Sequence, residues 1–221
     1  MKKWLTLALG ALWIGGCGFD VNTSGGGGPQ IVGSGKISSI SRKLGTFKGV
    51  SSEGSIDVEL TVGPARDAEI KGDDNLIGLV KTEIRGDTLH VFLDKNYSTR
   101  HGITVERFAP DVDAAAVAGS GSVTIHHVNG AALKLSIGGS GSMKVDGKTS
   151  HLAASVSGSG DLRLFDLHAT DADVSIMGSG DADVDVSGKL DASIAGSGSI
   201  TYHGKPQVTK SIAGSGDVAP G

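Results

Sequence analysis

Three aspartates each follow a copy of the tripeptide Gly-Ser-Gly, at Asp161, Asp181 and Asp217. Carboxylates that lie close together perform acid–base chemistry on glycosidic bonds. After the other three copies within residues 114–221 the same position holds serine, at Ser122, Ser142 and Ser199. Aspartate and serine side chains both hydrogen-bond backbone groups in turns. We therefore interpret this position as a turn position, with cation binding and polysaccharide catalysis as the alternatives.

The seven histidines are candidate metal ligands. His126 and His203 hold equivalent positions in repeats that lie four apart, which separates them by about 19 Å at the spacing of neighbouring strands. A shared metal ion needs ligand nitrogens about 2 Å from one centre. His127 directly follows His126, and adjacent residues of a strand face opposite ways. We expect surface histidines and no metal site.

The acidic segment Asp73-Asp74-Asn75 lacks the spacing of a calcium loop, which has oxygen ligands at alternate positions and a distal glutamate. The expectation here is a polar turn in which Asn75 caps a helical turn within 76–82. The sequence thus offers no catalytic residue, no cofactor-binding residue and no set of metal ligands. It predicts a protein that is not an enzyme.

These residues are positioned by a repeat. From residue 114 on, Gly-Ser-Gly begins at residues 119, 139, 158, 178, 196 and 214, so its spacing there is 18 to 20 residues. A period of that size is typical of a solenoid in which each repeat forms one coil. Glycine suits the corner because it adopts positive φ angles and lets neighbouring backbones approach closely. Gly33-Ser34-Gly35 and Ser52-Glu53-Gly54 lie 19 residues apart, which predicts that a degenerate repeat begins upstream.

Alternation of apolar and polar residues predicts two strands per coil, one that enters the corner and one that leaves it. One inward position is apolar in every regular coil, at Ile137, Val156, Ile176, Ile194 and Ile212. The position before it is always serine and is expected to face solvent, at Ser136, Ser155, Ser175, Ser193 and Ser211. In the last coil Lys210 replaces an apolar inward residue and Pro220 cannot donate to a strand. We expect edge protection there, with a docking end as the alternative.

The first 17 residues are typical of an export signal, because Lys2 and Lys3 precede an apolar run that ends at Cys17. Cys17 is the only cysteine, so no intramolecular disulfide can form. The stretch Ile14-Gly15-Gly16-Cys17 resembles a bacterial lipobox, which implies that Cys17 is acylated and anchors the protein. An ordinary secretory signal with an incidental cysteine is the alternative.

Beyond this signal (1–17), the chain divides into a Gly/Ser-rich tether (18–35), a degenerate solenoid half (36–113) and the regular repeats (114–221). Without the signal, 18 basic residues stand against 24 acidic ones, a net charge of −6. This balance argues against nucleic acid and against electrostatic docking on anionic lipid. The contact with membrane is therefore expected through lipid chains. Gly18 stands where an aspartate is the usual inner-membrane retention signal, which favours the outer membrane by resemblance.

The lipobox-type start, the stretch Gly72-Asp73-Asp74-Asn75-Leu76 continuing to Leu93, and the Gly-Ser-Gly units together resemble a bacterial family, the auto-transporter adhesin, head GIN domain family. The resemblance covers about residues 36–218 and implies a right-handed parallel β-helix, an envelope location and an adhesive role, with no residue-level site. The sequence thus predicts an all-β solenoid with coils of 18–20 residues. It would act as an adhesin or envelope scaffold on an unknown protein or envelope partner, facing the periplasm or the exterior. A lipid or small-ligand binding protein and a β-helix polysaccharide-active enzyme are the alternatives.

Overall fold

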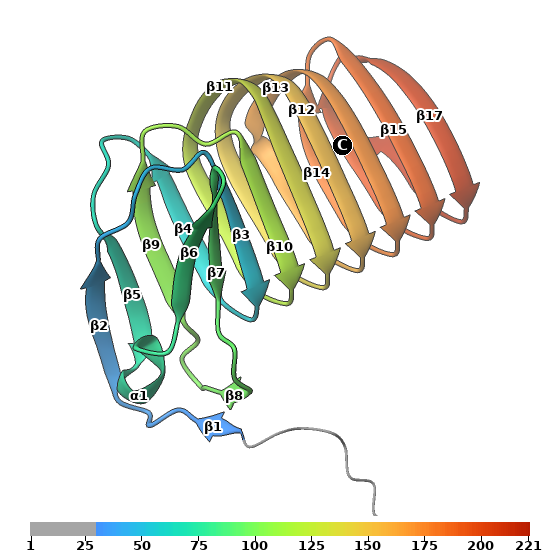
Figure 1. Ribbon diagram of the computed structural model, residues 1–221. Helices are drawn as coiled ribbons and strands as arrows, with labels where there is room; N and C mark the ends of the chain where they lie inside the picture. The colour runs from blue at the N-terminus through green and yellow to red at the C-terminus, as the bar shows by residue number, and fades with distance from the viewer. Residues whose placement is uncertain (1–29) are drawn as a thin grey trace, which may run out of the picture.

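The computed structural model describes residues 30–221, which form a β-solenoid of about five turns with almost no helix (Figure 1). The prediction of an all-β solenoid is confirmed. The expected export signal, Cys17 and all of the expected tether up to residue 29 lie outside the described residues.

The regular coils begin at Ala114. Their strands are β10 (Ala114–Gly119), β11 (Ser122–Gly139), β12 (Ser142–Gly158), β13 (Asp161–Gly178), β14 (Asp181–Val186), β15 (Lys189–Gly196), β16 (Ser199–Gly204), β17 (Gln207–Gly214) and β18 (Asp217–Pro220). Each strand pairs in parallel with equivalent residues of the next coil, so that Ile137, Val156 and Ile176 stand side by side. β11, β12 and β13 run from one corner around the far side of the coil to the next corner, and a register shift interrupts their pairing on the way.

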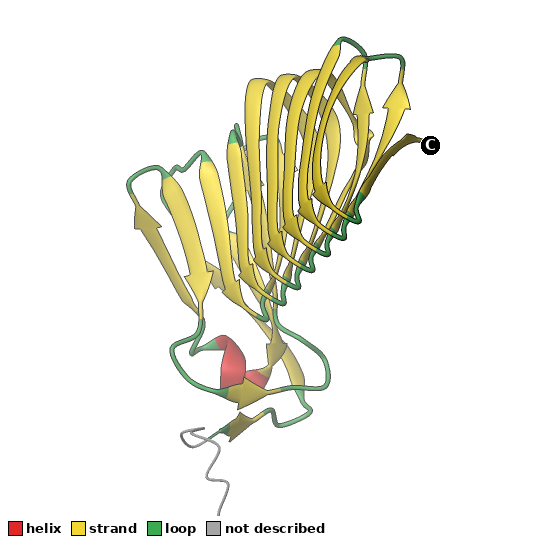
Figure 2. Cartoon of the chain, turned by 90° about the vertical axis from the view of Figure 1, so that its right-hand side faces the viewer, coloured by secondary structure: helices red, strands yellow, loops and turns green. Residues whose placement is uncertain are grey.

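The Gly-Ser-Gly corners stack in a row, which appears as a line of green turns in Figure 2. The first glycine of each corner has a φ between 125° and 142°, which L side chains rarely adopt. The second glycine is required by space, because a Cβ on Gly121 would lie 2.2 Å from the carbonyl oxygen of Ile56. The serine between them donates its N–H to the preceding coil, as Ser140 does to the Gly119 carbonyl at 3.0 Å.

The core is a set of apolar columns between the two strand segments of each coil. Ile137, Val156, Ile176 and Ile194 are at most 1% exposed, as predicted, and the serines before them are half-buried or exposed. Ile212 differs, since 43% of it is exposed. It stands beside Ile194 in the inward column, but its expected burial is wrong because no further coil covers it within the described residues. Burying a side chain of this kind contributes about 1.5–3 kcal/mol, so the columns carry most of the stability.

Before residue 114, the order of the strands in space differs from their order in the chain. β3 (Gly49–Gly54) and β4 (Asp57–Val62) form a coil that pairs with β10 and β11 on one side. On its other side it pairs with β7 (Thr88–Phe92) and β9 (Thr104–Ala109), which come later in the chain. The coil of β3 and β4 is therefore intercalated between two later segments.

The upstream extension of the repeat is confirmed at one of its two predicted places. Gly54 stands beside Gly119 in the register, so Ser52-Glu53-Gly54 does lead into a corner. Beyond the β7–β9 coil the parallel stack ends in antiparallel strands. β6 (Lys81–Arg85) pairs with β7, and β5 (Ala68–Asp73) pairs with β9 and with β2 (Ile37–Arg42).

Gly33-Ser34-Gly35 does not form a corner, contrary to the prediction. It follows β1 (Ile31–Val32), which pairs in parallel with β8 (Tyr97–Ser98), so ordered structure already begins within the range expected as tether. The segment is held because side chains at the start of the helix accept its N–H groups. Gly35 N donates to Asp73 Oδ1 at 2.6 Å.

A helical turn is present as α1 (Asp74–Ile77), but it begins within the acidic segment, and the end of the expected range 76–82 belongs to the strand β6. Its cap is not Asn75 as predicted, because Asp73 holds the N-cap position and makes no side-chain capping bond. Asn75 instead bridges two backbone groups of the first segment. Its Oδ1 accepts from Ser34 N at 3.0 Å, and its Nδ2 donates to the Val32 carbonyl at 2.9 Å.

Candidate functional site

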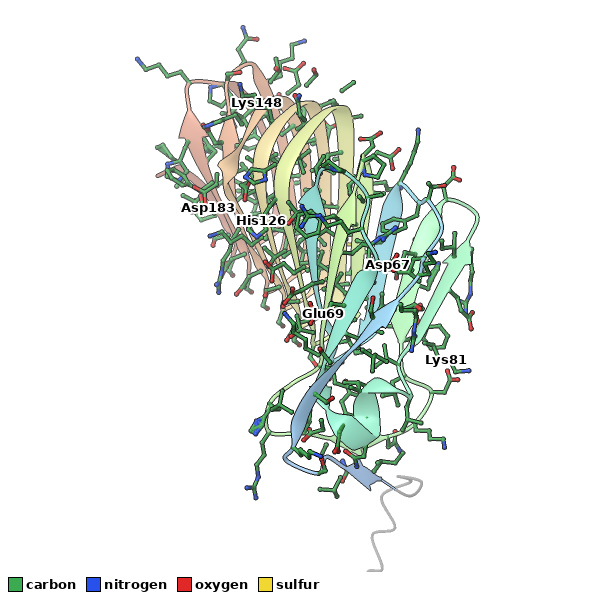
Figure 3. The ribbon with its side chains drawn as sticks, turned by 90° about the vertical axis from the view of Figure 1, so that its left-hand side faces the viewer. Asp67, Glu69, Lys81, His126, Lys148 and Asp183 are labelled. Carbon is green, nitrogen blue, oxygen red and sulfur yellow. The ribbon has the colours of Figure 1, made fainter. Side chains whose placement is uncertain are left out.

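The two outer surfaces of the solenoid carry different chemistry. We call the polar face the outward side chains of the segments that leave the corners, within residues 57–61, 122–126, 142–146, 161–165, 181–185 and 199–203. It holds seven acidic and two basic side chains. Figure 3 labels His126 and Asp183 on this face. The small-residue face consists of the outward side chains of the segments that enter the corners, within residues 134–138, 153–157, 173–177, 191–195 and 209–213, and it includes the serine column.

Of the aspartates after the corners, Asp161 and Asp181 lie on the polar face, and Asp217 follows the last corner, beyond the ranges that define this face. Asp161 stands beside Asp181 in the register, and Asp217 stands beside Ser199. Asp181 Oδ1 accepts hydrogen bonds from Ser199 N at 3.0 Å and from Ser199 Oγ at 2.6 Å. These bonds tie one corner to the next, which supports the turn interpretation of this position.

Asp57 is a corner aspartate that the sequence analysis missed. Its Oδ1 accepts from Ser122 N at 2.9 Å and from Ser122 Oγ at 2.7 Å, the same arrangement as at Asp181. The preceding residues Gly54-Ser55-Ile56 lack the second glycine of the repeat, so the tripeptide alone did not identify this corner. An aspartate followed by serine at the same position of the neighbouring coil is the recognisable signal.

Five of the seven histidines contact a carboxylate of a neighbouring coil. The pairs are His90 with Glu53 (3.0 Å), His126 with Asp146 (2.6 Å), His151 with Asp173 (3.3 Å), His203 with Asp183 (2.9 Å), and His168 with Asp185. The prediction of surface histidines is correct as far as it goes. It missed the pairing because each partner lies on another coil, and at His126 and His168 a register shift also intervenes.

The pair of His126 and Asp146 lies at a bulge in β11. The pairing of β11 with β12 shifts between Ile125 and Val128, and His127 has a φ of 62°. His127 is therefore exposed rather than turned inward, which corrects the expectation that the two histidines face opposite ways. Burial opposes ionisation of Asp146, but the His127 N–H and the His126 side chain outweigh it and lower the pKa of Asp146.

Phe165 is the second feature that sequence reasoning did not assign to a site. Its ring lies edge-on to the ring of His203, with 4.5 Å between the centroids. Beside it, the polar face contains a hollow of about 300 Å³, lined by Asp161, Arg163, Asp181, Asp183, Ser199 and Thr201. Arg163 lies 3.5 Å from Asp161. Carboxylates, a guanidinium and hydroxyl groups thus surround this hollow, and an aromatic ring stands next to it on the same strand.

The small-residue face contains a shallow groove of about 440 Å³ that crosses several coils. Ser155, Ser175 and Ser193 lie along it, with Lys134 and Asp191 toward its ends. Met177 is exposed on the same strands. Small side chains leave this surface apolar and nearly flat, which distinguishes it from the charged polar face.

Asp73 is a buried carboxylate at the end of the molecule where the chain enters the body, and it is 1% exposed. It accepts a hydrogen bond from the Thr99 hydroxyl and one from Gly35 N. The Thr99 bond is the main reason that the pKa of Asp73 is lowered, and the Gly35 N–H adds to it against the effect of burial. The carboxylate therefore ties together three segments of the chain.

Within residues 30–221, no three or more His, Cys, Asp or Glu side chains are grouped so that they could hold a metal ion. No helix in that range is both long and apolar enough to cross a membrane. Asp161 and Asp181 are brought together as neighbours, whereas Asp217 lies two coils from Asp181. Cys17, the expected lipidation site, lies outside the described residues.

Solved structures share this fold. A "putative adhesin" from Bacteroides fragilis NCTC 9343 aligns with a TM-score of 0.69 and 22% identity, covering 86% of this chain and 99% of its own. A "putative adhesin" from Parabacteroides distasonis ATCC 8503 aligns with a TM-score of 0.56 and 21% identity, covering 87% and 100%. A "putative lipid binding protein" from the same organism aligns with a TM-score of 0.53 and 25% identity, covering 87% and 100%.

No curated protein matches the chain in sequence. The family described as "putative auto-transporter adhesin, head GIN domain" matches residues 46–206. That range contains the intercalated coil, the polar face and nearly all of the Gly-Ser-Gly corners. The chain belongs to this adhesin head GIN domain family.

Proposed function

We propose that this protein is a non-enzymatic adhesive module of the bacterial cell envelope that binds its partner through the polar face. The observation that carries the proposal is the contrast between the two outer surfaces. One carries mainly small side chains with three charged residues, Lys134, Asp173 and Asp191, whereas the other presents nine charged groups, hydroxyls and an exposed aromatic ring over consecutive coils. Because the corners hold every coil in register, these groups form a rigid array that needs little ordering when a partner binds.

The net charge of the polar face determines which kinds of surface it can bind. Seven acidic side chains against two basic ones make the polar face negative. It is repelled by anionic phospholipid and attracted to neutral or cationic surfaces. The same repulsion turns the polar face away from an anionic bilayer to which the protein is attached. The partner is therefore an exposed polymer or protein, not the lipid surface itself.

Attachment through acylated Cys17 in the outer membrane is part of the proposal. Its support is the position of this lone cysteine at the end of an export signal, followed by a Gly/Ser-rich stretch that leads to the folded body. Such a spacer lets the body reach a partner beyond the lipid headgroups. The family to which the chain belongs supports a location in the envelope.

The test compares two sets of matched charge changes on beads coated with the full chain. Asp181→Asn with Asp185→Asn alters the polar face, and Asp173→Asn with Asp191→Asn makes the same change on the small-residue face. We expect the wild-type beads to be retained on whole bacterial cells or on host epithelial cells. The first pair should reduce retention several-fold and the second should not. Absent retention of wild-type beads, or equal losses for both pairs, would contradict the proposal.

The groove on the small-residue face favours a second candidate function, the binding of a lipid or another apolar small ligand. Its surface is almost wholly apolar, and its volume of about 440 Å³ falls within the usual range for ligand sites. One structural neighbour is described as a "putative lipid binding protein". Binding of a fluorescent fatty acid that Ser175→Trp abolishes, by filling the groove, would favour this candidate over the adhesive one.

A further inference from the structure

Phe165 is an aromatic side chain kept at the surface. It is 51% exposed, and it is the only aromatic among the large apolar side chains that are exposed in residues 30–221. An exposed ring of this size forgoes the stabilisation that burial would give. Aromatic residues dominate the binding energy of recognition surfaces, so a ring held in this position is the natural anchor of a site.

The ring is held in place by three coils. The pairing of β13 with β14 runs to Leu164 and Val184 and resumes at His168 and Asp185, so residues 165–167 project as a short excursion. Leu167 within it is buried and fixes it to the core. The ring rests edge-on against His203, and Asp183 Oδ1 accepts a hydrogen bond from His203 Nε2 at 2.9 Å. The platform is therefore arranged before any ligand arrives.

The hollow of about 300 Å³ beside the ring supplies hydrogen-bonding groups of both kinds. Arg163 lies two residues before Phe165 on the same face of the strand and stands beside Asp183, which stands beside Thr201. The carboxylates accept hydrogen bonds, the guanidinium donates, and the hydroxyl does both. Charge-assisted bonds of this kind are the strong ones, and planar groups also fix the orientation of a ligand.

This combination matches a sugar ring, which has an apolar C–H face to pack on an aromatic ring and hydroxyls at its edge to pair with carboxylates and guanidinium. The hollow is negatively charged, because it is lined by three aspartates (Asp161, Asp181 and Asp183) and one arginine, Arg163. This charge limits the class of sugar that can bind. A sialylated, sulfated or phosphorylated sugar would be repelled. The volume is at the low end for ligand sites, which suits one or two sugar rings.

We propose that Phe165, Arg163 and Asp183 form a binding site for a neutral saccharide unit. This inference rests on the proposed adhesive function and names the chemistry of the partner's surface. The aromatic ring supplies the apolar contact, and the neighbouring strands supply the polar ones. The stacked coils hold the two parts at a fixed distance from one another.

The experiment uses the full chain on an array of neutral oligosaccharides built from glucose, galactose, mannose and N-acetylglucosamine, with sialylated and sulfated glycans in parallel. We expect binding within the neutral set, and a loss of about tenfold or more in Phe165→Ala and in Asp183→Asn. Met177→Ala is the matched control, since Met177 is an exposed apolar residue on the other face. It should bind as the wild type does, and thermal melts should show that all variants fold.

No binding to any neutral glycan would overturn the proposal, as would full binding by folded Phe165→Ala or a preference for the anionic set. The adhesive function is judged separately, by retention of coated beads on cells. If Phe165→Ala beads are retained as well as wild-type beads, the saccharide site is wrong and the adhesive function stands. If wild-type beads are not retained at all, the adhesive function itself is wrong.

Discussion

The ammonium group of Lys210 donates a hydrogen bond to the carbonyl of Val218, across the mouth of the last coil. In the preceding coils the position of Lys210 is held by Ala192 and Val174, which are buried. A lysine here keeps its stem against the core and brings its charge to an edge that would otherwise be apolar. This arrangement supports the expected edge protection.

Replacing Lys210 with valine should extend the apolar column to the open edge next to exposed Ile212. We expect Lys210→Val to sediment as larger, concentration-dependent species than the wild type in analytical ultracentrifugation, because an unprotected edge recruits another chain. Lys205→Val, which changes an exposed lysine in the preceding loop, should leave the mass unchanged. Identical sedimentation of Lys210→Val and wild type would mean that this lysine does not protect the edge.

The assignment of inward and outward columns predicts unequal effects at adjacent residues. Ile176 is fully buried between neighbouring coils, so Ile176→Asp should destabilise the protein by about 4 kcal/mol or more, because it buries an unpaired charge. Ser175→Asp should cost less than about 1 kcal/mol, since that side chain reaches solvent. Urea denaturation measures both. Losses of equal size would show that the two faces are assigned wrongly.

The corner glycines should tolerate no side chain. Gly178 has a φ of 131°, and a Cβ there would lie 2.2 Å from the Gly158 carbonyl oxygen. We expect Gly178→Ala to lose about 2–3 kcal/mol or more. Gly138 provides the control, because its φ is ordinary and the nearest atom to its Cβ would be 3.8 Å away. Gly138→Ala should be neutral or stabilising by a few tenths of a kcal/mol, up to about 1, and similar chemical-denaturation midpoints for both variants would refute the assigned corner geometry.

Asp73 should make stability depend on pH in acid. Its folded-state pKa lies below the ordinary value of 3.8, so its contribution is complete above that value and is lost as the pH falls through the folded pKa. We expect the melting temperatures of wild type and Asp73→Asn to differ at neutral pH and to converge as the pH falls below 3.8. Exposed Asp111→Asn should follow the wild type throughout. A constant gap between wild type and Asp73→Asn would contradict the assigned role of the carboxylate.

The proposed lipid anchor can be tested by replacing a single atom, the sulfur of Cys17. Cys17→Ser removes the sulfur that would carry the acyl group, so it should abolish incorporation of labelled palmitate and move the protein from the membrane fraction to the soluble fraction. The folded body should melt at the same temperature in both forms. Continued labelling of the variant, or a soluble wild-type protein, would leave an ordinary secretory signal as the explanation for the first residues.

The regular coils could be predicted because each corner meets a local demand. At Gly139 and at Gly158, the positive φ and the nearby carbonyl oxygen of the preceding coil both require glycine. The spacing of these glycines therefore reveals the length of the coil in the sequence. The cap of α1 was assigned to the wrong residue because the choice between Asp73 and Asn75 depends on a strand more than thirty positions away. The helix-capping preferences of residues 73–75 therefore cannot predict a contact with a residue so far away in the chain.

The candidate site was harder to predict for the same reason. Phe165 and His203 meet because an excursion in one coil reaches over the next, and nothing in the alternation of residues reveals its direction. Pairs such as His168 and Asp185 are likewise fixed by where the register shifts. The sequence predicts which columns face outward, but the contacts between columns depend on the bulges.

The intercalated coil of β3 and β4 constrains how the protein folds. Ser55 and Ser120 lie 65 positions apart along the chain yet share a hydrogen bond, whereas later corners join residues 18 to 20 positions apart. Closing the longer loop costs about 1 kcal/mol more in chain entropy. We expect this closure to be the slow nucleation step, after which each coil templates the next and the array zips toward the C-terminus. After export, the regular repeats would therefore assemble only once the segment that contains β3 and β4 has folded.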